Sequence, residues 1–189
     1  DYQLASGLSQ DVETDDSVFR QTTARLPWLL IGMIGGIGNS MILGNFDTTF
    51  AAHPEMALYI PLIGGTGGNV GTQSSALVVQ GLANSSLDSG NTFQQILKES
   101  VVALINATII SMLVYIYNFI RFGATATVSY SVSISLFAVV MFASIFGTLV
   151  PMTLEKLKID PAIATGPFIS ITNDIIGMMM YMGITVLLS

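Results

Sequence analysis

The amino-acid sequence predicts an all-α protein that crosses a lipid bilayer several times. Hydrophobic residues make up 51% of its 189 residues, charged residues make up only 10%, and the mean hydropathy is +0.68. A soluble domain usually carries about 25% charged residues. Because this chain has too few of them for a water-facing surface, we expect most of its surface to face lipid.

Five stretches are long enough to cross the hydrocarbon core of a membrane, which needs about 20 mostly apolar residues. We expect these spans at residues 26–46, 56–83, 97–119, 131–152 and 167–188. Glycine or polar residues interrupt the second and the fifth. Glycine is common in membrane helices because it lets two backbones approach closely.

An odd number of spans places the two termini on opposite sides of the membrane, and the basic residues indicate which side is which. Cytoplasmic loops carry an excess of Lys and Arg. If the N-terminus is cytoplasmic, only Arg121 of the six basic residues lies outside. We therefore predict a cytoplasmic N-terminus and an outer C-terminus.

The first 24 residues differ from the rest of the chain because they are polar and acidic. Five of the twelve acidic residues lie in the first sixteen positions, so much of the net charge of -6 belongs to this segment. We expect residues 1–24 to be a cytoplasmic connecting segment, either a linker or a short amphipathic helix capped by Asp16, and residues 25–189 to be the membrane domain. The chain opens with Asp and shows no signal peptide, so we expect a fragment of a longer protein.

Several kinds of site are excluded by composition. The chain has no cysteine, which rules out disulfides, thiolate catalysis and cysteine-ligated zinc. No His-Glu-x-x-His motif, Gly-x-Ser-x-Gly elbow or pair of acids within one span supports an enzyme. The net negative charge belongs mostly to the N-terminal tail, and no nucleic-acid partner is expected.

Asp174 is the one acidic residue well inside an expected span. Ionisable groups at that depth are costly and mark functional sites by default. On a helix, Asp174 shares a face with Ser170, Gly177 and Tyr181, and Asn173 lies at the edge of that face. This small, polar face predicts a water-filled pathway. The alternative is a protonated Asp174 that forms a hydrogen bond to a neighbouring helix.

A second polar cluster occupies residues 64–75 in the second expected span. It contains five glycines within eight residues, and each costs a regular helix about 1 kcal/mol relative to alanine. Asn69 and Gln73 are four residues apart and share a helix face. We expect a broken or closely packed helix that lines a cavity, while glycine-mediated packing with amide hydrogen bonds is the alternative. No strand precedes these glycines, which excludes a nucleotide-binding loop.

Asp160 lies in the loop that joins the last two expected spans. It precedes Pro161, and an Asp before a proline is a typical helix cap. A role in attracting cations to the mouth of a pore is the alternative.

A single carboxylate in each chain suits Mg2+ better than other divalent cations. Mg2+ keeps several of its waters and binds through one or two carboxylates, whereas Ca2+ takes six to eight oxygen ligands. Zn2+ prefers His or Cys. If two chains meet on a two-fold axis, their Asp174 side chains form a pair that faces one ion.

Three sequence stretches together resemble the membrane domain of the MgtE-type magnesium channels, a family related to the eukaryotic solute-carrier magnesium transporters. The first is RLPWLL at residues 25–30, and the second is Pro61 followed by GNVGTQS at residues 68–74. The third combines DPA at 160–162, GPF at 166–168 and NDIIG at 173–177.

This resemblance implies a homodimer of five-helix subunits in the cell membrane, with the pore at the subunit interface. It implies that Asp174 holds a hydrated Mg2+, helped by backbone carbonyls near Ser170, and that Asn69, Gln73 and Asn173 line the pore. We add Gly177 to the pore-lining set because it shares the face of Asp174. Family members also have cytoplasmic N-terminal domains that sense Mg2+, and the resemblance implies that these are missing here.

Two modes of transport remain open from the sequence. One is passive flow of hydrated Mg2+ through a channel, and the other is secondary transport of divalent cations coupled to protons or sodium. Secondary transporters often contain inverted repeats, and residues 35–39 and 64–69 do share a glycine-rich run that ends in Asn. Chance similarity between glycine-rich segments explains that likeness adequately.

Overall fold

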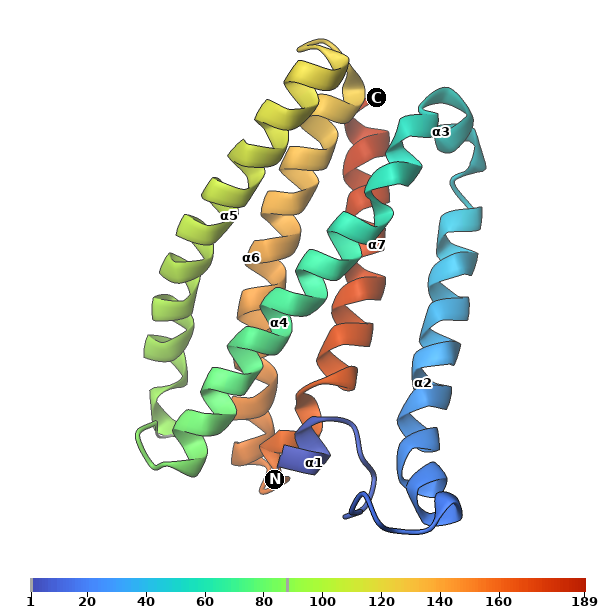
Figure 1. Ribbon diagram of the computed structural model, residues 1–189. Coiled ribbons are helices and arrows are strands. Elements are labelled where there is room, and N and C mark those ends of the chain that lie inside the picture. The colour runs from blue at the N-terminus through green and yellow to red at the C-terminus, as the bar shows by residue number, and fades with distance from the viewer. Residues whose placement is uncertain (1, 88) are drawn as a thin grey trace.

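The computed structural model describes residues 2–87 and 89–189, and within these ranges the chain forms helices and no strand. The long helices run alternately in opposite directions, so the termini lie at opposite ends of the molecule (Figure 1). These long helices are α2 (Val18–Gly44), α4 (Ile60–Ala83), α5 (Thr92–Phe122), α6 (Thr127–Lys156) and α7 (Pro167–Leu188). The short elements are α1 (Tyr2–Ala5), α3 (Asp47–Ala52) and the 3-10 helices η1 (Pro54–Tyr59), η2 (Ser89–Asn91) and η3 (Pro161–Ala164).

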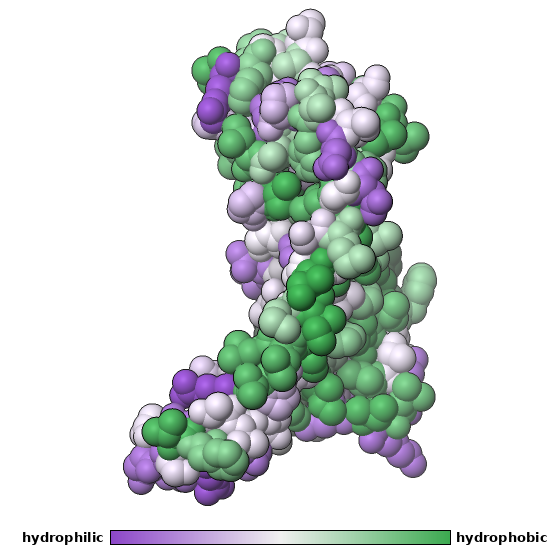
Figure 2. Space-filling model, turned by 90° about the vertical axis from the view of Figure 1, so that its right-hand side faces the viewer, coloured by the Kyte–Doolittle hydropathy of each residue, from purple (hydrophilic) through white to green (hydrophobic). Residues whose placement is uncertain are grey.

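The expected count of five hydrophobic spans has to be corrected. In the described part of the chain, four helical segments are both long and apolar enough to cross a membrane: α2, α5, α6 and the η3–α7 segment. The expected span that does not qualify is the second, residues 56–83, which corresponds to α4 and has 24 helical residues but is rich in glycine and polar side chains. These residues lower its hydropathy, so α4 is long without being strongly hydrophobic. Hydrophobic side chains cover much of the middle of the face shown in Figure 2, and hydrophilic ones are most frequent near its two ends.

Helix α6 lies at the centre of the bundle and packs against α4, α5 and α7. Small residues such as Ser135, Ala143 and Gly147 are fully buried along it, and small residues allow close approach of neighbouring helices in membranes. Leu136 of α6 joins Ile63 of α4 and Met178 of α7 in the apolar core. The core thus fixes α4 and α7 against the same helix.

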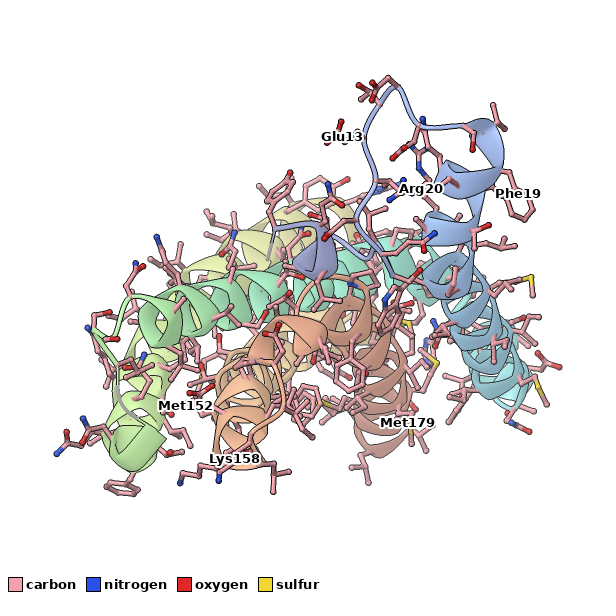
Figure 3. The ribbon with its side chains drawn as sticks, turned by 90° about the horizontal axis from the view of Figure 1, so that it is seen from below. Glu13, Phe19, Arg20, Met152, Lys158 and Met179 are labelled. Carbon is pink, nitrogen blue, oxygen red and sulfur yellow. The ribbon has the colours of Figure 1, made fainter. Side chains whose placement is uncertain are left out.

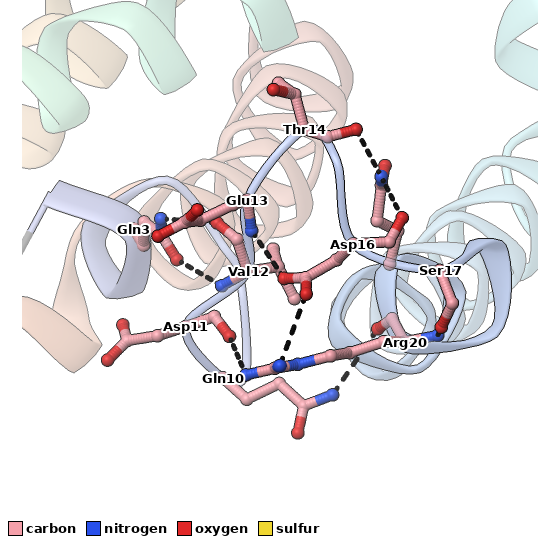
Figure 4. A network of polar contacts seen from close by, with 10 residues as sticks. Gln3, Gln10, Asp11, Val12, Glu13, Thr14, Asp16, Ser17 and Arg20 are labelled. Carbon is pink, nitrogen blue, oxygen red and sulfur yellow. Dashed lines mark hydrogen bonds and ion pairs between the residues drawn. The ribbon is translucent and has the colours of Figure 1, made fainter.

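Helix α2 stands apart from this core, and its main packing partner is α7 (Figure 1). It begins at Val18, where the Ser17 side chain accepts a hydrogen bond from the Arg20 backbone N–H. The predicted cap at Asp16 is therefore wrong by one position. Asp16 instead accepts a hydrogen bond from Arg20 at 3.2 Å within a network of polar contacts (Figure 4).

The N-terminal segment before α2 folds back beneath α7. Its first turn, α1, packs against η3, and the Thr165 hydroxyl lies 3.4 Å from the Ala5 carbonyl oxygen, to which it donates a hydrogen bond. Seen from this end of the molecule, Arg20 and Lys158 lie on different sides of the bundle (Figure 3). The N-terminal segment is therefore packed against this end of the bundle.

We predict that Gly147→Ala destabilises the bundle. A Cβ at Gly147 would lie 2.5 Å from the Gly71 carbonyl oxygen, and backbone cannot move aside cheaply. Such overpacking typically costs about 1–3 kcal/mol. Thermal unfolding of the purified protein in detergent should show a lower Tm for this variant. Gly36→Ala is the matched control because nothing lies within 4 Å of its Cβ position, and an equal Tm loss in both variants would contradict the prediction.

Candidate metal site

Asp174 lies near the middle of α7, half-buried between α2 and α4. The Asn39 amide of α2 donates a hydrogen bond from Nδ2 to Asp174 Oδ2 at 3.3 Å. Asp174 Oδ1 makes no hydrogen bond and Asp174 forms no ion pair within the described residues. One oxygen of this carboxylate is thus oriented by a neutral donor, and the other, which faces Gly64 of α4, has no hydrogen-bond partner among the described residues.

Glycines of α4 allow the backbone to pass directly beside this carboxylate. A Cβ at Gly64 would collide with Asp174 Oδ1, and a Cβ at Gly68 would lie 3.0 Å from Ser170 Oγ. The two glycines are four residues apart, as are Ser170 and Asp174, so each pair faces the other across the contact between the helices. The glycine cluster in the sequence therefore gives room to the polar face of α7.

The other residues predicted on this face divide into exposed and buried groups. Ser170 is exposed, whereas Asn173 and Gly177 are buried. Asn173 lies against Gly71 of α4, and both polar atoms of its side chain lack a hydrogen-bond partner in the described part of the chain. Tyr181 is fully buried and donates a hydrogen bond to the Met56 carbonyl oxygen at 2.7 Å, so it anchors the far end of α7.

Asn69 and Gln73 share a face of α4 that does not contact Asp174. Asn69 is exposed, and Gln73 borders a separate cavity between α4, α5 and α6. No contact among the described residues joins either side chain to Asp174, and their place in a pore stays a prediction.

Asp160 has the capping role that its position predicts. Its carboxylate accepts a hydrogen bond from the Ala162 backbone N–H at 3.0 Å, at the start of η3. The capping prediction is confirmed, and a role at a pore mouth stays a prediction.

Asn39 is the site residue that the sequence analysis missed. It comes from α2, 135 positions before Asp174. The sequence did contain an indication of its role, since Asn39 is an amide inside an apolar span. Polar side chains at that depth usually face a partner or a cavity.

The oxygen atoms at this site suit a hydrated cation. Residues 2–87 and 89–189 contain no group of three or more His, Cys, Asp or Glu side chains that could hold a bare metal ion. One carboxylate, a nearby hydroxyl and backbone oxygens can instead accept hydrogen bonds from the waters of Mg2+, which dehydrates reluctantly.

Comparison with known proteins agrees with this chemistry. Residues 60–184 match the model of a family described as MgtE, divalent cation transporter. The chain belongs to the MgtE family. This confirms the resemblance inferred from the sequence motifs, and with its apolar helices the chain is a multi-pass membrane protein. Membership of a transporter family also agrees with the expectation that the chain is not an enzyme.

Three relatives, each named magnesium transporter MgtE, are similar over most of this chain. The Bacillus subtilis protein is 32% identical over 184 residues, which are 97% of this chain and 41% of the relative. The Thermus thermophilus protein is 32% identical over 165 residues, 87% of this chain and 36% of the relative. The Enterococcus faecalis protein is 28% identical over 184 residues, 97% of this chain and 40% of the relative. The chain thus spans about two fifths of the length of these MgtE proteins.

We predict that Gly64→Ala impairs cation transport by this MgtE chain, because the added methyl group forces the Asp174 carboxylate to turn away. Substitutions that misorient a metal-binding group typically cost about 10-fold or more in activity. The measurement is divalent-cation uptake into proteoliposomes. Gly65→Ala is the control, since nothing lies within 4 Å of the Cβ position at the adjacent glycine. Equal uptake by the two variants would refute the role given to Gly64.

Proposed function

We propose that this chain carries Mg2+ across the membrane and that Asp174 binds the hydrated ion on its way. The observation that supports this most directly is the half-buried Asp174 carboxylate, which has a neutral amide on one oxygen and no hydrogen bond on the other among the described residues. Membership of a divalent cation transporter family and three relatives named as magnesium transporters support the choice of ion.

The ion keeps its inner waters, and the protein contacts the ion through those waters. The Asp174 oxygens accept hydrogen bonds from these waters, and the negative charge offsets the cost of bringing Mg2+ to this depth. Asn39 holds the carboxylate in place from α2, and Ser170, one turn before Asp174, adds a hydroxyl on the exposed side of α7. The glycines of α4 leave the space that the Asp174 carboxylate and the Ser170 hydroxyl occupy, which larger side chains would fill.

The proposed pore forms between two copies of the chain related by a two-fold axis. Ser170 is exposed in the single chain, and the apolar side chains of Leu29, Met33 and Ile37 on α2 are exposed as well. A two-fold axis beside α7 brings two Asp174 carboxylates to one ion, which matches its double charge. The exposed Asn69 amide is available to line the same passage.

Passive permeation fits this site better than coupled transport. Asp174 forms no ion pair in the described part of the chain, and its one hydrogen-bond partner there, Asn39, does not titrate. A proton relay needs a chain of titratable groups at the substrate site, and neither Asn39 nor Ser170 provides one. We therefore propose a channel.

Single-channel recording tests this mode of transport. Purified protein in a planar bilayer with Mg2+ as the charge carrier should give unitary currents that persist without a proton or sodium gradient. Flux that requires either gradient, at the low turnover of a carrier, would establish coupled transport instead.

We predict that Asp174→Asn abolishes rescue of a bacterial strain that needs high external Mg2+ to grow. The substitution keeps the size of the side chain and removes its charge, so the hydrated cation loses its main attraction. Glu155→Gln is the control because that carboxylate is exposed at the end of α6 and belongs to no site described above. Both variants must reach the membrane in equal amounts, and full rescue by Asp174→Asn would remove the proposed site.

We predict that Ser170→Cys cross-links two chains. The protein has no cysteine of its own, so the introduced thiol is the only one present. Treatment of membranes with a short bifunctional thiol reagent should give a band of twice the monomer mass on a denaturing gel. Thr108→Cys, on the exposed side of α5, should give none. Equal cross-linking at the two positions would argue against an interface beside α7.

A further inference from the structure

A second polar cavity lies between α4, α5 and α6, with a volume of about 290 Å3. Most of its walls are apolar, but six side chains offer oxygen atoms to it: Gln73, Ser74, Gln95, Glu99, Asn106 and Ser144. No residue of α2 or α7 borders it. The site of Asp174 does not use any of these six residues.

Glu99 is the acidic residue of this cavity, and the fold holds it in place. The Ser74 hydroxyl donates a hydrogen bond to Glu99 Oε1 at 2.6 Å, and Ser74 is only 4% exposed. Glu99 makes no ion pair in the described part of the chain, although Lys98 also borders the cavity. A half-buried carboxylate is therefore fixed by a buried hydroxyl while its charge stays unpaired.

The cavity and Asp174 lie on different sides of α4. Gly64 and Gly68 face Asp174 and Ser170, whereas Gln73 and Ser74 face α5 and α6. Positions five and six residues beyond Gly68 are rotated away from it around a helix of 3.6 residues per turn. A ligand in the cavity would thus be separated from Asp174 by the α4 backbone.

We propose that this cavity is a second binding site for a hydrated divalent cation of the Mg2+ type. Apart from Lys98, each polar side chain that lines it carries a hard oxygen ligand, which Mg2+ prefers, and a single carboxylate suffices for an ion that keeps most of its waters. Six waters occupy roughly 180 Å3 at their share of liquid volume, so a hydrated ion fits. Glu99 accepts hydrogen bonds from the waters of the ion, and the amide and hydroxyl oxygens accept the rest.

The effect of Lys98 on affinity distinguishes a bound cation from a bound anion. Lys98 lines the same cavity, so its positive charge repels a bound cation. Removal of the Lys98 charge therefore strengthens cation binding. An anionic ligand such as a lipid phosphate would show the opposite dependence, because Lys98 would then be its main attraction.

A cation at Glu99 would also connect α4 to α5. The Ser74–Glu99 contact is the one hydrogen bond between side chains of these two helices in the described part of the chain. Ser74 lies three residues from Gly71, whose backbone contacts Gly147 of α6 and the Asn173 side chain of α7. The second site is thus placed to steady the helix that makes room for Asp174.

Mn2+ binding followed by electron paramagnetic resonance tests the proposal with the full chain in detergent. Asp174→Asn is the background for every variant, so that ions bound at Asp174 do not contribute. We expect Glu99→Gln to lose one bound Mn2+ for each chain relative to this background, and Mg2+ to displace that ion. Glutamine retains an oxygen that can accept the Ser74 hydrogen bond, and an unchanged Tm without metal confirms that the variant is folded.

Two further variants complete the test. Lys98→Met should bind this Mn2+ severalfold more tightly, and Glu155→Gln, at the end of α6, should leave it unchanged. Loss of no Mn2+ in Glu99→Gln, or weaker binding in Lys98→Met, would overturn the proposal. The second result would indicate an anionic headgroup in the cavity. The binding measurement does not depend on the proposed transport function, because every variant in it carries Asp174→Asn. A failure of the Asp174 proposal would therefore leave this test intact.

Discussion

The close contact between the α4 backbone and the polar face of α7 determines the geometry of the candidate metal site. Gly64 leaves room for the Asp174 carboxylate, Gly68 for Ser170, and Gly71 for Asn173. On the side toward α6, Gly71 meets Gly147 backbone to backbone. Glycine is unfavourable in an isolated helix by about 1 kcal/mol relative to alanine, so this helix depends on packing for its stability. The same contacts that keep α4 helical also fix the surroundings of Asp174.

The contact also explains why α4 is not a strongly hydrophobic helix. A helix surrounded by lipid needs apolar side chains all round, but α4 packs along α6 on one side and α7 on the other. Glycine and serine serve those contacts better than leucine because they let the backbones meet. The sequence analysis counted this segment as the second of five hydrophobic spans because of its length and its few charges. Hydropathy measures how well a helix suits lipid, and α4 is built mainly to suit its neighbours.

The features that the sequence predicted correctly are those set by local spacing. The helices of the bundle, the cap at Asp160 and the shared face of Ser170 and Asp174 depend on residues within a few turns of each other. Asn39 could not be predicted in the same way, because its contact with Asp174 depends on how α2 leans on α7. Asn69 and Gln73 share a face, as predicted, but periodicity along one helix does not tell which neighbour that face meets. In the fold it turns toward solvent or lipid and toward α5, while the glycine face turns toward α7.

The pairing of Asp174 with Asn39 also bears on the alternative of a protonated, purely structural carboxyl group. A neutral carboxylic acid donates one hydrogen bond, and a structural role would give that proton a fixed acceptor on a neighbouring helix. The Asn39 contact provides no such acceptor, since the amide donates from Nδ2 to Asp174 Oδ2. Asn39 therefore orients the carboxyl group without supplying a counter-charge, and within the described residues no basic side chain pairs with Asp174. A negative charge held at that depth in a membrane helix needs a mobile counter-charge or water. A hydrated divalent cation supplies both at once, which is why this contact favours transport over a structural role.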